Sequence, residues 1–222
     1  MKALRLVDVK RLEIADLPVP SLPEGYALIE VKACGICMSD VHMFLGHFPV
    51  SFPVTVGHEF GGIVKEIRNA GKAVYSGMSE TKRIREGDRV VVNPLVHCGS
   101  CASCLSGRFN LCSSPKALGG AGDVVIDGAF AEYVAVPLSS LGPLPTHVGW
   151  DEATMVEPIG CCLHGIDRSR IRQGHSVAVI GAGVIGLILI RLALLQGADR
   201  VIAVEKNDQR RLDAGGADIA GV

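Results

Sequence analysis

Residues 177–186, VAVIGAGVIG, decide the fold of the second half of the chain, because three glycines stand between two apolar runs. The run 175–180 predicts a buried strand, 184–196 an apolar helix and 200–205 a second strand. At such a turn the glycines allow a tight bend, close approach of a pyrophosphate and close helix packing. The pattern predicts the first βαβ portion of a Rossmann domain, with the dinucleotide on Gly181, Gly183, Val184, Ile185 and Gly186.

The end of the second predicted strand indicates which dinucleotide this is. Glu205 follows Gly186 by nineteen positions, where a carboxylate can accept hydrogen bonds from ribose hydroxyls and repel a 2′-phosphate. NAD is therefore favoured over NADP. The alternative is an ordinary charge at a strand end, and the neighbouring Lys206 leaves some room for NADP.

Residues 1–148 form a predicted β-rich domain, and residues 149–222 a linking helix followed by the partial Rossmann domain. The first part holds short β-branched runs separated by proline, glycine and charged turns. They are ALRLVD, RLEIADL, YALIEVKA, FGGIVKEI, DRVVVN and AFAEYVAV. The polar stretch 69–86 predicts an extended exposed loop, and a single helix is expected from Asp151 to residue 168.

Four cysteines lie close together in the run CGSCASCLSGRFNLC, within a predicted lobe at about residues 94–115. Two-residue spacers let one turning segment supply several tetrahedral ligands, as a structural Zn²⁺ site requires. Two disulfides or four unrelated thiols are the alternative. The predicted ligands are Cys98, Cys101, Cys104 and Cys112.

A second, less regular set of metal-binding side chains lies upstream. CGICMSDVH followed by GHEF supplies Cys37, His42, His58 and Glu59, a mixture suited to zinc with an open coordination position. Each of these residues alone would more often be packed or otherwise satisfied. Glu157 stands in an apolar helix start, where an unpaired charge is costly, so it needs a partner such as a metal or metal-bound water. A surface glutamate is its alternative.

Bulk properties exclude several classes of function. A net charge of −1 over 222 residues gives no electrostatic footprint for nucleic acid or an anionic membrane. The amino-terminal residues are interrupted by charges and contain no signal-peptide core, so we expect a cytoplasmic protein. Residues 177–195 are apolar, but their glycines and Arg191 fit a soluble βα unit better than a membrane span.

Together these residues resemble the zinc-containing medium-chain alcohol dehydrogenases, closest to their polyol branch, the sorbitol dehydrogenase-like enzymes. The resemblance covers nearly the whole chain and rests on five motifs in the family's order. They are CMSDVH at 37–42, GHE at 57–59, the four-cysteine lobe, Glu157-Pro158, and GAGVIG at 181–186. It implies a GroES-like β-barrel catalytic domain joined to a Rossmann domain, with catalytic zinc between them.

Carried over residue by residue, the resemblance implies specific roles. Cys37, His58 and Glu59 resemble catalytic zinc ligands, with Glu157 bound directly or through water. The simple-alcohol branch uses a cysteine in that region, so Cys161 or Cys162 is the alternative, although we expect both to be packed near the cofactor. Ser39 and His42 resemble the proton relay from the zinc-bound alcohol, and Asp40 resembles a residue that orients a ligating imidazole.

The implied protein is an NAD-dependent oxidoreductase of a polyol or secondary alcohol with two Zn²⁺ per subunit. Such a small-molecule enzyme is expected to form a homo-oligomer, a dimer or tetramer. A single βαβ unit leaves sheet edges uncovered, so the sequence is expected to be an amino-terminal fragment. A simple-alcohol or threonine-type dehydrogenase and a non-catalytic zinc-binding remnant are the alternatives.

Overall fold

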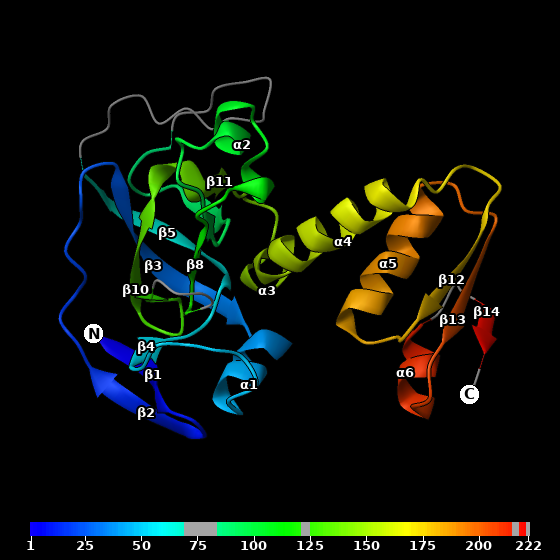
Figure 1. Cartoon of the computed structure of the whole chain (residues 1–222), viewed down its shortest axis with the longest axis horizontal. Helices are drawn as coiled ribbons and strands as arrows, with labels where there is room; N and C mark the ends of the chain where they lie inside the picture. Colours follow the sequence, from blue (N-terminus) through cyan, green and yellow to red (C-terminus); the bar gives the residue numbers. More distant parts are fainter. Residues whose placement is uncertain (69–83, 121–124, 215–217, 221–222) are drawn as a thin grey trace. The chain divides into compact units, whose positions relative to one another are not determined.

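The computed structural model describes residues 1–68, 84–120, 125–214 and 218–220, which fall into two units, Met1–Val156 and Glu157–Val222 (Figure 1). Of the exposed loop predicted over 69–86, residues 69–83 lie outside the described part. The apolar stretch 177–195 is divided between a strand and a helix. Among the helices of the described residues, none is both long and apolar enough to cross a lipid bilayer.

The first unit is built on a five-stranded antiparallel sheet in the order β10-β3-β5-β6-β11. Its apolar side chains gather into one core that includes Ile29, Phe60, Val90 and Val136. Four of these strands cover runs predicted as strands, and β11 was not predicted. The strands are β3 (Tyr26–Gly35), β5 (Glu59–Ile67), β6 (Arg89–Val92), β10 (Tyr133–Pro137) and β11 (Leu141–Pro143).

Two smaller sheets complete the first unit, in the orders β2-β1-β4 and β7-β8-β9. Two-residue strands such as β4 and β7 are too short to show an alternating pattern in sequence. The strands are β1 (Lys2–Asp8), β2 (Arg11–Asp16), β4 (Val54–Thr55), β7 (Leu95–Val96), β8 (Lys116–Leu118) and β9 (Val125–Ile126). The helical elements of this unit are α1 (Met38–Phe44), α2 (Ala102–Leu105), η1 (Phe109–Leu111), η2 (Leu138–Ser140) and α3 (Trp150–Thr154).

Arg89 on β6 fastens the last part of the first unit to the sheet. Its guanidinium donates to the carbonyls of Thr146 at 2.7 Å and Val148 at 2.6 Å, and it lies 4.2 Å from the ring centroid of Trp150. Helix α3 therefore packs with the first unit, and the structure divides after Val156. The predicted boundary after residue 148 and this division are separated by residues 149–156, which contain α3.

The single helix predicted over 151–168 is two helices, α3 and α4 (Val156–Ser169). Pro158 has no N–H to donate to the carbonyl of Thr154, so a continuous helix would lose a hydrogen bond at this point. The chain turns at Met155 instead, which is the C-cap of α3.

The second unit carries a parallel sheet in the order β12-β13-β14. Strands β12 (Ser176–Ile180) and β13 (Arg200–Val204) and helix α5 (Val184–Leu195) form the predicted βαβ portion. Helix α6 (Asp208–Asp213) and strand β14 (Asp218–Ala220) add half of a further unit, and that strand was not predicted. The core of this unit includes Ile190 on α5 and Val201 on β13.

Close packing at the start of α5 depends on Gly186. A Cβ at this position would overlap the carbonyl oxygen of Gly181, whereas a Cβ at Gly183 would have nothing within 4 Å. We expect Gly186→Ala to lower the free energy of unfolding by about 1–3 kcal/mol, the usual range for overpacking. Gly183→Ala, the matched control, should lower it by less than about 1 kcal/mol.

Urea titration of the whole chain, followed by circular dichroism, measures both variants. Equal effects of the two substitutions would contradict the packing argument.

Candidate functional site

Three side chains that can ligate a metal meet beside the start of α1. Cys37 is the N-cap of that helix, Glu59 begins β5, and His58 directly precedes this strand. Strands β3 and β5 pair antiparallel with Gly35 opposite Glu59, which brings the two segments to the same end of the sheet. The ligand atoms of the three side chains lie within 4.8 Å of one another. Small side-chain rotations would therefore bring all three within the bond lengths of about 2.0–2.3 Å that zinc requires.

Gly35 makes room for the carboxylate of Glu59. A Cβ built at position 35 would lie 2.5 Å from Oε2 of Glu59 and 3.2 Å from its Cβ. The glycine that ends β3 is therefore needed for the carboxylate to turn toward the other two ligands.

Asp40 on α1 connects the segments of this site. Only 6% of its surface is exposed. Its Oδ2 accepts from the amide of Cys37 at 2.9 Å, and its Oδ1 accepts from the amide of Gly57 at 3.3 Å. The same Oδ1 lies 3.5 Å from Nδ1 of His58. The carboxylate therefore occupies the place from which it can orient the imidazole.

The contact with Asp40 leaves the other nitrogen of His58 on the side of the candidate ligands. Nε2 of His58 lies 3.4 Å from Oγ of Ser39. Burial opposes the charged imidazole, but the hydrogen bonds and charges of Asp40 and Cys37 outweigh it and raise the pKa of His58 to about 9. Without a metal, His58 is thus protonated at pH 7, and a bound cation would have to displace that proton.

His42 lies on α1, one turn after Ser39. Its ring has a neighbour that the sequence analysis missed, since its Nδ1 is 3.2 Å from Nδ1 of His47. Gly46 before His47 was the available signal, because a glycine just after a helix often brings the next residue back against the last turn, but it could be used only if the short helix α1 had been predicted.

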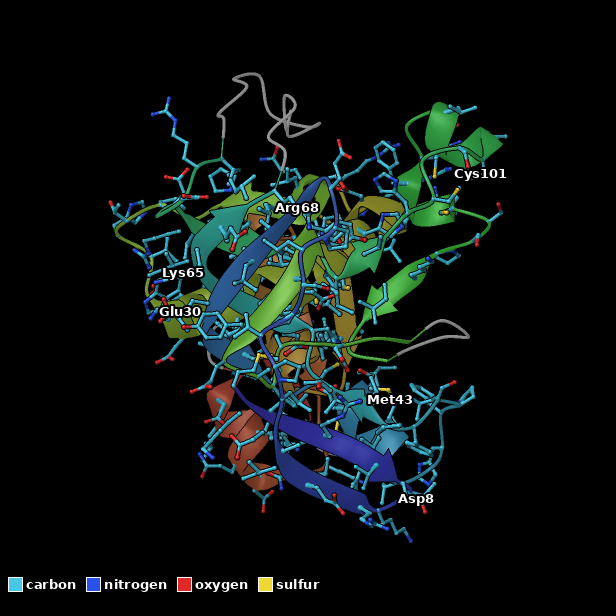
Figure 2. All side chains as sticks on the ribbon, turned by 90° about the vertical axis from the view of Figure 1, so that its left-hand side faces the viewer. Asp8, Glu30, Met43, Lys65, Arg68 and Cys101 are labelled. Atoms are coloured by element: carbon cyan, nitrogen blue, oxygen red, sulfur yellow. The ribbon has the colours of Figure 1, made fainter. Side chains whose placement is uncertain are left out.

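The four cysteines of the lobe meet around a second point. Their sulfur atoms lie within 4.8 Å of one another, and Sγ of Cys98 is 3.9 Å from Sγ of Cys104. A tetrahedron of sulfurs about 2.3 Å from zinc has edges of about 3.8 Å, so the set fits that ion. All four cysteines are free thiols, which argues against the alternative of two disulfides. Figures 1 and 2 show this lobe, with α2 and Cys101, away from α1 and Met43.

Backbone amides prepare the lobe for negative charge on sulfur. The amide of Cys98 donates to Sγ of Cys112 at 3.3 Å, and that of Cys101 donates to Sγ of Cys98 at 3.4 Å. Hydrogen bonds from the amides of Ser113 and Cys104 lower the pKa of Cys101 to about 5. Burial raises the pKa of Cys104 to about 12, so this thiol would give up its proton only to a cation.

The glycine-rich turn of the second unit leads directly into α5. Gly181, whose φ is +95°, donates its amide to the carbonyl of Val204, and Gly183 is the N-cap of α5. The space around Gly183 and the exposed side chains of Val184 and Ile185 leave the amino-terminal end of α5 accessible. This arrangement fits a pyrophosphate on the amides of the turn.

Glu205 has contacts that the sequence analysis did not foresee. It is only 6% exposed, and its two oxygens accept from the amides of Ala182 and Asn207, each at 2.9 Å. These amides, Asn207 first, lower the pKa of Glu205. The carboxylate ties the glycine turn to the end of β13. Each oxygen keeps a second lone pair that can accept from a ribose hydroxyl.

The remaining candidate ligands lie on α4 in the second unit. Glu157 stands in its first turn, with its Oε1 3.6 Å from Sγ of Cys161. Cys162 is buried, as expected, and its Sγ lies 3.7 Å from the carbonyl of Ile185. Cys161 is exposed, so the expectation that it is packed was wrong. The choice among these residues as a fourth ligand stays a prediction.

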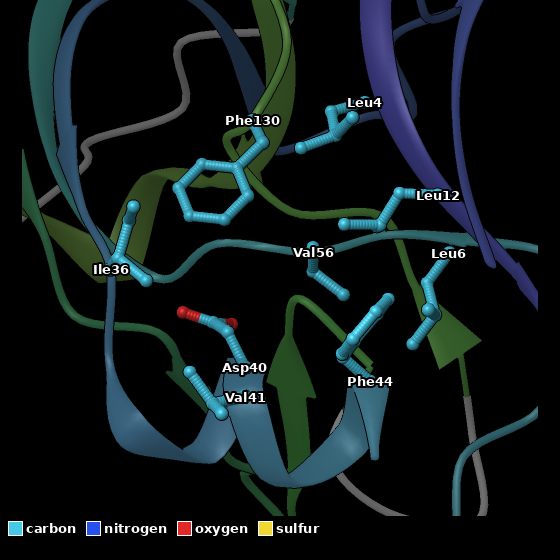
Figure 3. A pocket seen from close by; sticks show the side chains of 9 residues that line it. All are labelled: Leu4, Leu6, Leu12, Ile36, Asp40, Val41, Phe44, Val56 and Phe130. Carbon is cyan, nitrogen blue, oxygen red and sulfur yellow. The ribbon is translucent and has the colours of Figure 1, made fainter. Parts of the chain in front are cut away.

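A pocket beside α1 has the wrong lining for a sugar alcohol. Figure 3 shows nine side chains around it, which come mainly from β1, β2 and α1. Among these described residues Asp40 alone is polar, and its oxygens already face the amides of Cys37 and Gly57. This pocket therefore offers an apolar surface and no polar side chain that is not already hydrogen-bonded. The lining residues are Leu4, Leu6, Leu12, Ile36, Asp40, Val41, Phe44, Val56 and Phe130.

Comparison with protein families identifies residues 23–146 as an alcohol dehydrogenase GroES-like domain. This match includes the four-cysteine lobe and Cys37, His58 and Glu59. It covers more than half of the chain and confirms the predicted fold of the first unit.

Relatives extend the similarity over both units. A sorbitol dehydrogenase of Halalkalibacterium halodurans is 38% identical over 200 residues, which are 90% of this chain and 54% of the relative. An L-threonine 3-dehydrogenase of Bacillus velezensis is 36% identical over 201 residues, 89% of this chain and 54% of the relative. The chain thus spans about half the length of the curated relatives it matches.

A solved structure gives the same picture. It is described as a zinc-binding dehydrogenase of Sinorhizobium meliloti 1021 bound to NADP. The two chains are 38% identical, the match covers 100% of this chain and 61% of the solved chain, and the TM-score is 0.87.

The two clusters predict two zinc ions, each of which is lost when a cysteine of its own cluster is replaced. Elemental analysis of purified protein should give two zincs per chain, and Cys37→Ser and Cys101→Ser should each leave one. Cys101→Ser should also lower the unfolding temperature, because a closed site stabilises its own lobe. Cys34→Ser, whose thiol belongs to neither cluster, is the matched control and should keep both ions. One zinc in the unaltered protein that survives Cys101→Ser would rule out zinc in the lobe.

Asp40→Asn tests how the first site is oriented. An amide has a similar shape but lacks the charge and one acceptor, so His58 should be held less firmly. Loss of such a partner usually weakens metal binding by about 10- to 100-fold. Competition with a fluorescent zinc chelator measures the affinity, with Cys101→Ser as background so that only the first site is observed. An unchanged affinity would remove Asp40 from this role.

Proposed function

Because the chain belongs to the zinc-containing medium-chain alcohol dehydrogenase family, we propose that the whole protein oxidises a polyol or another secondary alcohol with NAD. The observation that carries this proposal is the cluster of Cys37, His58 and Glu59. Asp40 contacts the amide of Cys37 and the ring of His58 and so helps to hold the cluster in place. A thiolate, an imidazole and a carboxylate suit a catalytic zinc that keeps a position open for substrate.

Cys37, His58 and Glu59 would hold the ion, with Glu157 as the proposed further ligand, direct or through water. When bound, zinc lowers the pKa of an alcohol hydroxyl and polarises the carbonyl that forms. Ser39 supports the assignment of the proton path, because its Oγ lies beside Nε2 of His58 at the edge of this cluster. We propose that Ser39 takes the hydroxyl proton and that His42 passes it toward solvent.

The glycine turn and Glu205 support a dinucleotide on the second unit. The pyrophosphate would rest on the amides at Gly183, Val184 and Ile185. Gly181 forms the tight bend with its own amide on the carbonyl of Val204, and Gly186 lets α5 begin close to the turn. A bound nicotinamide accepts the hydride that leaves the alcohol carbon. Glu205 favours NAD, because its carboxylate would repel a 2′-phosphate. The Sinorhizobium relative was solved with NADP, so both dinucleotides belong in the test.

A threonine-type dehydrogenase is the second candidate, supported by the Bacillus velezensis relative. Threonine carries a secondary alcohol, so the same zinc chemistry applies to it. The difference lies in how the amino and carboxylate groups of the substrate are bound, which the residues named above do not decide. The simple-alcohol branch and a zinc-binding protein without activity remain as outcomes of the test.

Two further properties follow from this proposal. All eight cysteines are free thiols, which suits a reducing compartment, and we place the protein in the cytoplasm. We also propose that it forms a homo-oligomer, a dimer or tetramer, which analytical ultracentrifugation would measure.

The deciding experiment measures NADH formation by the full-length protein with sorbitol, other polyols, 2-butanol, ethanol and L-threonine. Polyols or 2-butanol should give the highest kcat/KM, and Cys37→Ser should abolish it. Preference for threonine would support the second candidate. Zinc binding without turnover on any alcohol would refute the proposed function.

Glu205→Gln tests the choice of dinucleotide. The change removes the negative charge at nearly constant size, so the preference for NAD over NADP should fall by about tenfold, which corresponds to 1.4 kcal/mol. The neighbouring exposed Lys206→Ala serves as the control for a change of charge. Titration calorimetry gives both dissociation constants, and an undiminished preference in Glu205→Gln would assign it to other residues.

A further inference from the structure

The end of α1 forms a turn that fixes His47 against His42. The amide of His47 donates to the carbonyl of His42 at 2.8 Å, and that of Gly46 donates to the carbonyl of Met43 at 3.1 Å. With Leu45 as the C-cap, these are the two hydrogen bonds of a Schellman motif. In such a motif the residue two positions after the cap contacts the residue three before it, and here both are histidines.

Gly46 is the residue that allows this turn. Its φ is +76°, a conformation that side chains disfavour, and a Cβ there would lie 3.0 Å from Cγ1 of Val9. The amide of Lys10 also donates to the carbonyl of Phe44 at 2.7 Å, so the turn between β1 and β2 supports the end of the helix. The position of His47 is therefore set by backbone hydrogen bonds and not by its own side chain.

The two imidazoles meet through their Nδ1 atoms, which are 3.2 Å apart. At this separation one Nδ1 carries a proton and the other accepts it. Phe48 packs on the His42 ring, with ring centroids 5.1 Å apart, and helps to hold that ring in place. His42 is half-buried and His47 is exposed, so the pair leads from the helix to solvent.

We infer that His47 is the exit of the proton path, a positioning residue that acts through His42. This inference rests on the proposed function, which brings the hydroxyl proton to His42. Since Nδ1 of His42 faces His47, Nε2 of His42 is left to receive that proton. The proton on Nδ1 of His42 then moves to Nδ1 of His47, and His47 releases its Nε2 proton to water. One proton enters and one leaves, so the pair gains no net charge, and exchange with water resets the tautomers between turnovers.

The other charged groups near this turn have different partners. The oxygens of Asp40 face the amides of Cys37 and Gly57 and the ring of His58, as described above. Asp8 at the end of β1 accepts from the amide of Val9. Arg11, at the start of β2, is paired with Glu13.

His47→Phe tests the inference in the full-length protein, because phenylalanine keeps an aromatic ring against His42 but cannot exchange a proton. In weakly buffered solution at pH 7, kcat should fall by about three- to tenfold, less than the loss of a primary acid–base group. Added imidazole should restore it, while KM for the alcohol stays unchanged. His147→Phe makes the same change at another exposed histidine and should leave kcat unaltered. Full turnover of His47→Phe without imidazole would overturn the inference.

A second readout does not depend on turnover. In metal-free, cofactor-free protein labelled with ¹⁵N-histidine, His47→Phe should shift the Nδ1 resonance of His42, because the hydrogen bond between the two Nδ1 atoms is lost. An unshifted resonance would overturn the pairing. If His42→Ala is impaired and His47→Phe is not, the inference fails while the proposed function stands. If no alcohol is oxidised by the unaltered protein, both fail together.

Discussion

The buried carboxylate of Asp40 is the constraint on which the first site depends. A carboxylate with 6% of its surface exposed is costly unless it is hydrogen-bonded, and Asp40 meets this cost through the amides of Cys37 and Gly57 and the ring of His58. These partners belong to two segments nearly twenty residues apart. The need to satisfy one charge therefore brings together the loop before α1 and the loop before β5. The candidate ligands lie beside that charge because the loops do.

Sequence patterns predicted those strands and helices that are long enough to show a hydrophobic repeat. The run YALIEVKA contains the β-branched Ile29 and Val31 and forms most of β3, and the apolar run 184–196 contains α5. The seven residues of α1 span only two turns, so they show no reliable helical period, and this helix was missed. The break between α3 and α4 was also missed, although Pro158 supplies its cause. Spacing indicated Cys37, His58 and Glu59 as candidate ligands, and the structure brings these three together, whereas the Asp40 network required distances between loops.

Glu205 shows why a residue's role is incompletely predicted by its place in a motif. Its position after β13 predicted a contact with ribose, and the structure adds two amide contacts that hold the glycine turn to the sheet. The two roles use different lone pairs of the same oxygens, so they are compatible. The two roles also support each other. The amides keep the carboxylate of Glu205 charged, and this charge is what would repel a 2′-phosphate. A strand-end carboxylate of this kind stabilises the fold before any cofactor binds.

The residues of the proposed chemistry lie at both ends of helix α1, because the N-cap and the C-terminal turn of the helix position them. At its start, Cys37 is the N-cap, where Asp40 accepts from its amide. At its end, the helix must stop with a residue at positive φ, and Gly46 supplies it. The stop signal returns the following residue to the last turn, so the identity of residue 47 decides what faces His42. Most side chains in that position would only pack. A histidine there converts an ordinary helix end into a pair of hydrogen-bonded imidazoles, and the seven residues of the helix fix their distance from the candidate ligands.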